Sequence, residues 1–475
     1  MNRIKSNIAI IFIVTISLFS LFSSCKEKSM EGMIVFTQVS GDLPDANYTS
    51  GNSWRYFSNS RIVALNHEKP EESLKVLTNG YFSACSPQIS YDGKSMIFTA
   101  QKEQNDVWQI WEMDLENLKV KQVTFSNENC VDPAYLPGER MVFSKFTTNN
   151  TVKKGYSLFT CNLDGSNINQ ITFNPHTYFA STVLHDGRVL TISSQLYPNQ
   201  RDGMFMILRP DGTKAELFYK SLKGSEINSR GWETTNGKVV FIESDSNNTS
   251  GSNIISVKYN RPLHSSVNLT STIKGDFHSI YPMKDDRFLV SYRSSNDDRF
   301  SLYEFDSENK TLGQTIFKDK NYNAIEAIVV KKQKRPKKLP SAVNMDVKTG
   351  LLLCQDINFS NTHLQGNTNS KAVSLEVVGI DSSLGIVDVE KDGSFYLKVE
   401  ADMPFRIQTI DINGNIVNGP GSWIYLRPNE RRGCVGCHEN NEQVPNNVQP
   451  LSVRKDPILI PVNRKKVKNK KISVD

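Results

Sequence analysis

The sequence predicts an all-β protein in which a six-bladed β-propeller is followed by a small β-sandwich domain. A unit of roughly 45 to 50 residues recurs between residues 86 and 319. Each copy combines a tight turn with short runs of apolar residues, which is typical of short antiparallel strands. Beyond residue 342 the repeat stops, but strand-like runs continue around the turns Asp392-Gly393 and Asn413-Gly414, which we expect to form hairpins.

The propeller prediction depends on five turns at near-constant spacing, each followed by an apolar run: Asp92-Gly93, Pro137-Gly138, Asp186-Gly187, Asn236-Gly237 and Asp285-Asp286. A sheet of four short strands cannot bury both faces unless neighbouring sheets stack on it, and radial stacking gives a propeller. Residues 33–39, 60–66 and 74–79 supply a first blade, and residues 322–330 close the ring. The Asp-Gly turn and the Gln-Ile-Thr ending of the repeats resemble TolB-like proteins, a resemblance that concerns fold rather than function.

The composition divides the chain into five parts. Residues 331–342 interrupt the alternation with six Lys or Arg residues and two Pro residues, which indicates a linker or a surface strap. The predicted organisation is a leader over residues 1–25, a propeller over 26–330, a basic linker over 331–342, a β-sandwich over 343–450 and a basic tail over 451–475.

The N-terminus has the pattern of an export signal. Arg3 and Lys5 precede an apolar run over residues 8–22, and Ser23-Ser24 then precede Cys25. The run is shorter than the roughly 20 residues that a membrane-spanning helix needs. Small residues before the cysteine resemble the lipobox of bacterial lipoproteins, so we expect lipidation at Cys25, with plain secretion as the alternative. The expected location is the periplasmic side of the inner or outer membrane, or the cell surface.

The charge distribution gives no argument for a nucleic-acid partner. The formal net charge is +6, and six Lys or Arg residues lie within residues 464–471. A basic cluster at one end of a chain is usually solvated. Without these six positive charges the rest of the chain is near neutral.

Residues 434–438 spell C-x-x-C-H, which in an exported chain is the signature of c-type haem. The thiols of Cys434 and Cys437 can bond to the two vinyl groups on one edge of the porphyrin, and His438 can then ligate the iron. Gly433 and Gly436 leave room for the macrocycle. Zinc is one alternative, but a closed site needs four ligands and the chain has no second C-x-x-C pair. A redox thiol pair is the other, although the βαβ context is missing. We therefore expect one covalent haem.

The remaining cysteines, Cys85, Cys130, Cys161 and Cys354, are widely separated in the sequence. Their spacing does not indicate a disulfide framework. We interpret them as buried thiols.

The sequence leaves the sixth iron ligand open. His363 lies in the same domain as the motif, and His278 and His185 fall at propeller positions that could face the haem. No Tyr occurs after Glu439, so a phenolate ligand cannot come from just downstream. Arg431 and Arg432 are candidates to pair with haem propionates, with a solvated basic turn as the alternative.

Residues 390–439 resemble the middle domain of the hydrazine synthase alpha-subunit family, with Trp423, Pro428, Glu430 and the CVGCHE stretch at matching places. The resemblance implies a propeller joined to a β domain that ends in a haem loop. The family's best-known member makes hydrazine from nitric oxide and ammonia. Two departures speak against that activity here: only 37 residues follow His438, and Glu442 stands where an aromatic ligand is expected.

Three functions are compatible with these features. The preferred one is an electron-transfer or redox component that docks a redox partner protein and reaches the membrane through its lipid anchor. The second is a haem enzyme acting on a small nitrogen or oxygen species. The third is a propeller that serves as an interaction platform. The sequence identifies no catalytic residue, and a lone haem without a proton donor gives little support for catalysis.

Overall fold

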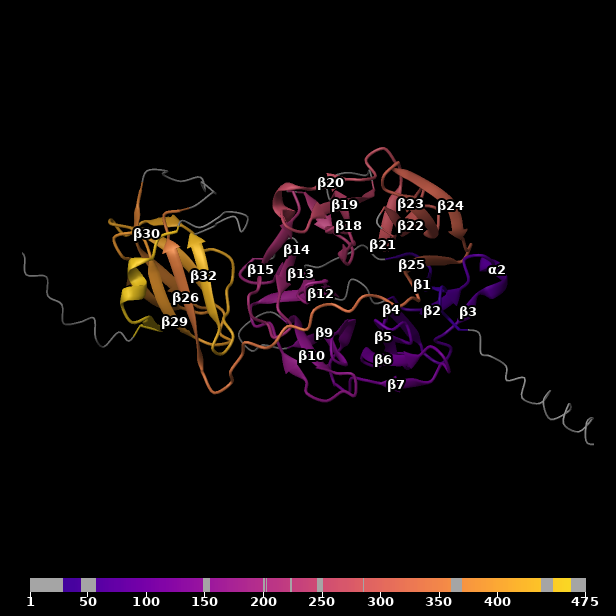
Figure 1. The fold of residues 1–475 in the computed structure, drawn as a ribbon, viewed down its shortest axis with the longest axis horizontal. Coiled ribbons are helices and arrows are strands. Elements are labelled where there is room, and N and C mark those ends of the chain that lie inside the picture. The colour runs from indigo at the N-terminus through magenta and orange to yellow at the C-terminus, as the bar shows by residue number, and fades with distance from the viewer. Residues whose placement is uncertain are drawn as a thin grey trace, which may run out of the picture.

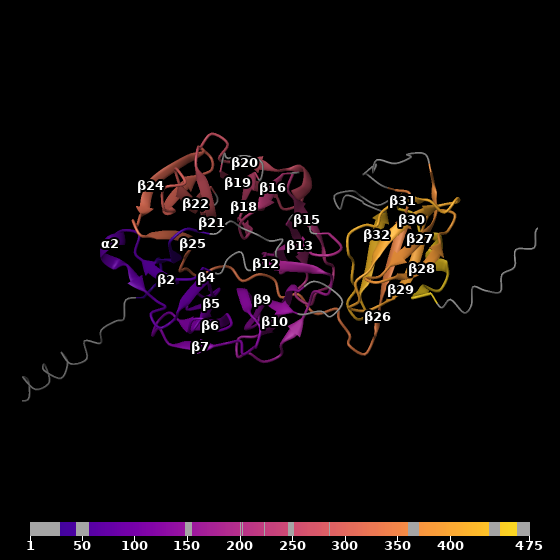
Figure 2. The same cartoon turned by 180° about the vertical axis from the view of Figure 1, so that it is seen from behind.

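The computed structural model describes residues 29–43, 57–147, 154–199, 201, 203–222, 224–245, 251–284, 286–359, 370–436 and 447–462. In Figure 1 these residues form a ring of sheets beside a smaller β domain, and Figure 2 shows the same arrangement from behind. The predicted all-β class, with a propeller followed by a β-sandwich, is confirmed. None of the helices in the described ranges is long and apolar enough to cross a bilayer.

The first blade joins the two ends of the propeller, because its strands come from both. In spatial order it contains β25 (Tyr322–Val329), β1 (Ile34–Ser40), β2 (Ser60–Leu65) and β3 (Lys75–Val76). This is the closure that the sequence predicts. The short helix α2 (Pro70–Ser73) connects β2 to β3.

Five further sheets complete the ring. The second blade contains β4 (Ser83–Ile89), β5 (Ser95–Gln101), β6 (Gln109–Asp114) and β7 (Val120–Gln122). The third contains β8 (Cys130–Leu136), β9 (Arg140–Thr147), β10 (Gly155–Asn162) and β11 (Asn169–Gln170). The fourth contains β12 (His176–Val183), β13 (Val189–Gln195), β14 (Met204–Leu208) and β15 (Glu216–Lys220). In the fifth blade, β16 (Ser225–Ile227) and β17 (Trp232–Glu233) both pair with β18 (Lys238–Asp245), and β19 (Ser252–Lys258), η1 (Pro262–His264) and β20 (Val267–Asn268) follow. The sixth contains β21 (Asp276–Lys284), β22 (Arg287–Arg293), β23 (Ser301–Asp306) and β24 (Thr311–Phe317).

The predicted turns connect the strands of individual blades. Gly93, Gly138, Gly187 and Gly237 have φ angles of +76°, +86°, +89° and +76°, in the region where a residue without Cβ is favoured. Each lies between the first two strands of its blade or, for Gly237, between β17 and β18. Asp285, in the fifth predicted turn, lies outside the described residues.

Neighbouring blades are joined by hydrogen bonds between bulges on their inner strands. The Ser86 amide donates to the Glu326 carboxylate at 2.8 Å, and the Ser86 hydroxyl donates to Asp132 at 3.1 Å. Asp132 also accepts from the Ala180 amide at 3.1 Å, while the Glu326 amide donates to the Ser279 hydroxyl at 2.9 Å. Ser86, Asp132, Ala180 and Glu326 all have positive φ. A bulge leaves one residue outside the strand ladder, and here its polar groups bond to the next blade.

The basic linker crosses the propeller as a strap, which Figure 1 shows as the orange segment between β25 and β26. Its Gln333 amide donates to the Tyr91 carbonyl at 2.8 Å, and its Lys337 amide donates to the His185 carbonyl at 3.1 Å. A Cβ on Gly187 would lie 2.1 Å from the Lys337 carbonyl oxygen. The strap is therefore held against the blades by its backbone, while its charged side chains remain largely exposed.

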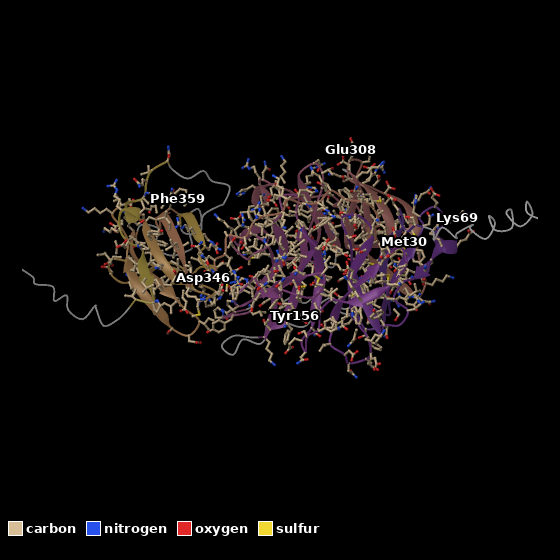
Figure 3. The ribbon with its side chains drawn as sticks, turned by 60° about the horizontal axis from the view of Figure 1, so that its bottom comes forward. Met30, Lys69, Tyr156, Glu308, Asp346 and Phe359 are labelled. Carbon is tan, nitrogen blue, oxygen red and sulfur yellow. The ribbon has the colours of Figure 1, made fainter. Side chains whose placement is uncertain are left out.

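The C-terminal domain contains two sheets around one core. The first has the order β32 (Arg431–Gly436), β26 (Thr349–Asp356), β29 (Phe395–Glu400) and β33 (Ile458–Ile460). The second has the order β28 (Ser383–Asp388), β27 (Ala372–Val378), β30 (Arg406–Asp411) and β31 (Ile416–Asn418). Leu352 and Leu397 of the first sheet pack in the same core as Leu375 and Val377 of the second. Figure 3 places Asp346 and Phe359, which flank β26, in this domain.

Two sequence predictions need correction in this domain. Residues 451–460, assigned above to a basic tail, include η2 (Leu451–Arg454) and the strand β33, which pairs in parallel with β29. Apolar residues within the basic stretch, among them the buried Ile460, complete the sandwich. Asp392-Gly393 is a tight turn but not a hairpin, because it joins β28 and β29 of different sheets, whereas Asn413-Gly414 does join the paired strands β30 and β31.

Candidate cofactor site

Cys434 lies on the edge strand β32, which runs parallel to β26. Side chains of a strand alternate between its two faces, and Arg432, Cys434 and Gly436 line one cavity, whereas Val435 lines a different pocket behind the strand. Cys434 is half-buried. Cys434 therefore lines the wall of this cavity and does not lie on the open surface.

The cavity beside Cys434 lies between the propeller and the C-terminal domain, with a volume of about 470 Å³. This is within the roughly 300–1,000 Å³ that is usual for small-molecule and cofactor sites. Its walls combine propeller residues near β15 and η1 with sandwich residues: Lys214, Ala215, Glu216, Leu217, Leu263, Leu352, Cys354, Phe395, Ile407, Gly421, Ser422, Ile424, Arg432, Gly433, Cys434 and Gly436. Aliphatic and aromatic side chains make up much of this wall, as a porphyrin face requires.

The segment over residues 423–427, which ends in a turn at residues 428–429, fixes the propeller against the sandwich. The Trp423 indole donates to the Tyr197 carbonyl at 2.8 Å, and the Tyr425 hydroxyl lies 3.0 Å from the carbonyl oxygens of Ile171 and Gly212. Ile424 of this segment forms an isolated bridge with Phe405 of the sandwich. The backbone of this segment bonds to the sandwich, where Ile424 and Phe405 exchange two hydrogen bonds at 2.8 Å, while the Trp423 and Tyr425 side chains bond to the propeller.

Glu430 connects the propeller to the wall that carries Cys434. Its carboxylate accepts the Lys214 amide at 2.8 Å and the Arg427 amide at 2.8 Å, and it pairs with the Arg432 guanidinium at 2.7 Å. The Glu430 side chain is 2% exposed. Arg427 in turn bonds to Asp402 at 2.9 Å. Arg427 and Arg432 therefore both have carboxylate partners inside the protein.

The expectation that Arg431 and Arg432 pair with haem propionates receives mixed support from this geometry. Arg432 lines the cavity, but its charge is already paired with Glu430. Arg431 is exposed and does not line the cavity. Lys214, which the sequence analysis did not consider, is the cavity-lining cation for which the described structure gives no ion pair.

The predicted sixth ligands within the described residues do not lie at this cavity. His278 is in the propeller, with its ring 5.4 Å from that of Phe300. His185 lies under the strap, where its Nδ1 is 3.3 Å from the Glu233 carboxylate, and this hydrogen bond raises the pKa of His185. Neither histidine lines the cavity beside Cys434, so the described structure does not bring either candidate to this cavity. Cys25, His363, Cys437, His438 and Glu442 lie outside the described residues.

The four remaining cysteines are buried, as interpreted above, but they are not equivalent. Cys85, Cys130 and Cys161 lie in the propeller core, where burial raises the pKa of Cys130 to about 11 and that of Cys161 to about 12. Cys354 instead lines the same cavity as Cys434. The spacing of these cysteines in the sequence gave no signal of this.

The described residues fit a covalently bound porphyrin. Cys434 faces a recessed, largely apolar cavity of about 470 Å³. Of the two glycines predicted to leave room for the macrocycle, Gly433 has open space at the position of a Cβ, whereas a Cβ on Gly436 would lie 2.1 Å from the Phe359 carbonyl oxygen. The cavity beside Cys434 is the space into which a bulky group on its sulfur would extend.

Comparisons with known proteins agree with this architecture. Residues 350–439 match the family model of the hydrazine synthase alpha subunit middle domain. Hydrazine synthase subunit alpha of Kuenenia stuttgartiensis is 22% identical over 508 residues, which cover 80% of this chain and 62% of that protein. The chain thus spans less than two thirds of the length of this relative.

Among solved structures, Kuenenia stuttgartiensis hydrazine synthase superposes with a TM-score of 0.74 at 21% identity, covering 89% of this chain and 71% of that one. This similarity shows a shared fold across propeller and sandwich. TolB from Acinetobacter baumannii covers 63% of this chain and 66% of its own at 14% identity and a TM-score of 0.45.

Proposed function

We propose, from its membership of a hydrazine synthase alpha-subunit-like family, that this chain is an exported, lipid-anchored protein with one c-type haem on Cys434 and Cys437 and with His438 as an iron ligand. The observation that carries the proposal is the position of Cys434 on β32, facing the cavity between propeller and sandwich. Bound haem would supply one-electron redox chemistry. The chain would act as an electron-transfer or redox component that docks a partner protein.

The protein's own residues have defined tasks in this proposal. Strand β32 holds Cys434 at the cavity wall, and Leu352 and Phe395 exclude water from one side of it. The propeller residues around Leu217 cover the other side. Lys214 provides a positive charge for an anionic group such as a propionate.

A second candidate function is binding or conversion of a small nitrogen or oxygen species. The specific observation in its favour is the volume of the cavity beside Cys434, about 470 Å³, which is within the roughly 300–1,000 Å³ that is usual for small-molecule sites. Hydrazine synthesis is an activity named for the relative from Kuenenia stuttgartiensis, and we do not transfer it to this chain.

Haem staining of the full chain, produced with its leader in a host that attaches c-type haem, tests the attachment. We expect covalent staining in the wild type and its loss or weakening in Cys434→Ala and Cys437→Ala. Cys161→Ala is the matched control, because this buried thiol lies in the propeller core, and it should stain normally. Unchanged staining in the two motif variants would contradict the proposal.

The spectrum of the loaded protein separates the two candidate functions. Low-spin six-coordinate iron that binds carbon monoxide slowly would support electron transfer, and rapid binding to the reduced protein would support an open site. Anchoring needs its own test: Cys25→Ala should move the protein from the membrane fraction to the soluble fraction. Retention in the membrane fraction would argue against lipidation.

A further inference from the structure

Cys354 and Cys434 are direct neighbours across two parallel strands. The register between β26 and β32 pairs Leu352 with Arg432, Cys354 with Cys434 and Asp356 with Gly436. Both cysteines line the same cavity, so their side chains lie on the same side of the sheet. The pair is separated by 80 positions in the sequence, which is why the motif alone did not reveal it.

The spacing of paired strands is compatible with a covalent link between these two cysteines. Neighbouring strands lie about 4.8 Å apart, and the Cα atoms of a disulfide are usually roughly 4.4–6.8 Å apart. The two thiols differ in access, because Cys354 is 2% exposed whereas Cys434 is half-buried. Cys434 is therefore the thiol that a soluble oxidant reaches first.

We propose that Cys354 and Cys434 form a reversible disulfide in the haem-free protein. The oxidant is a disulfide, such as oxidised glutathione or the active-site disulfide of an oxidoreductase. The Cys434 thiolate attacks one sulfur of the oxidant and releases the first reduced thiol. The Cys354 thiolate then attacks the Cys434 sulfur and releases the second, so two protein thiols are oxidised and one oxidant disulfide is reduced.

This disulfide would control cofactor attachment, a consequence that rests on the proposed function. A thioether to the porphyrin needs the Cys434 thiol in its reduced form. In an oxidising compartment the disulfide with Cys354 would block that thiol, and a reductant would release it. Cys354 would thus act as a modification site that sets when Cys434 is available.

The linkage can be mapped in the full chain purified without haem. Reduced protein is treated with oxidised glutathione, quenched with acid, unfolded and alkylated, and the linked peptides are identified by mass spectrometry. We expect the wild type and Cys437→Ser to lose the alkylation of Cys354 and Cys434 together and to yield one linked peptide pair. Cys354→Ala should yield no such pair, and its urea unfolding midpoint shows whether it is folded.

Two results would overturn the proposal. One is alkylation of Cys354 that remains complete after oxidation of Cys437→Ser. The other is a wild type in which Cys434 links only to Cys437. A haem-loading arm keeps the proposed function separate: the oxidised chain should load haem only after reduction by dithiothreitol. If the reduced chain also fails to load, the haem assignment fails while the disulfide result stands on its own.

Discussion

The substitution Glu430→Gln tests whether one buried carboxylate joins the propeller to the strand that carries Cys434. It keeps the side-chain volume but removes the charge opposite Arg432, which lies 2.7 Å away. It also turns an amide N–H₂ group toward one of two backbone donors, the amides of Lys214 and Arg427. Breaking a buried ion pair from one side costs about 3–5 kcal/mol. Because the Arg432 side chain is 14% exposed, we expect the lower end, about 3 kcal/mol, which is more than a hundredfold in the unfolding equilibrium.

Urea unfolding followed by tryptophan fluorescence measures this loss, because the Trp423 indole is hydrogen-bonded across the same junction. The control is Arg431→Ala, at an exposed position of the same strand, which should change the unfolding free energy by less than about 0.5 kcal/mol. Adding Arg432→Met to Glu430→Gln should recover part of the loss, since the uncompensated charge is removed. A loss below about 1 kcal/mol for Glu430→Gln, or no recovery in the double variant, would refute the reasoning.

Three further outcomes follow from described contacts. Burial lowers the pKa of His176 from 6.5 to about 3, so the free energy of unfolding should fall by up to about 1.4 kcal/mol per pH unit as the pH drops from 6.5 toward 3. The urea midpoint of His176→Asn should fall less over this range, and parallel curves of midpoint against pH for variant and wild type would contradict this. Tyr425→Phe removes a hydroxyl that bonds to the propeller, which should cost about 1 kcal/mol in urea unfolding, and an unchanged midpoint would argue against it. Gly187→Ala places a Cβ against the Lys337 carbonyl at positive φ; faster proteolysis within the strap should result, and wild-type resistance would show that the strap does not depend on this contact.

The sequence was informative where structure follows from local pattern. An Asp-Gly or related turn followed by an apolar run predicts two neighbouring strands of a blade. Both signals are local, because the positive φ of a turn residue and the alternation of side chains in a strand depend on neighbouring residues in the sequence. Closure by residues 322–330 was also predictable, since the first blade lacked one strand.

The parts that could not be predicted depend on pairing between distant segments. The register of Cys354 with Cys434, the position of Glu430 between Lys214 and Arg432, and the bulges at Asp132 are set by packing of strands far apart in the chain. For the same reason the sequence does not show that His278, in β21, and His185 lie away from the cavity beside Cys434. The sequence therefore identifies the C-x-x-C-H motif but not the residues that surround it in the fold.

The turn between β14 and β15 is where the two connections to the sandwich converge. The Asp211 carboxylate accepts the Ala342 amide at the end of the strap at 2.8 Å, and the Asp211 carbonyl accepts the Arg427 guanidinium at 3.1 Å. Together with the bonds of Trp423 and Tyr425 to other propeller positions, these attachments restrict the rotation that a single tether would permit. Any group held by Cys434 would then sit at a constant depth below the protein surface. Under the proposed redox function, electron exchange would be governed by where a partner binds rather than by hinge motion.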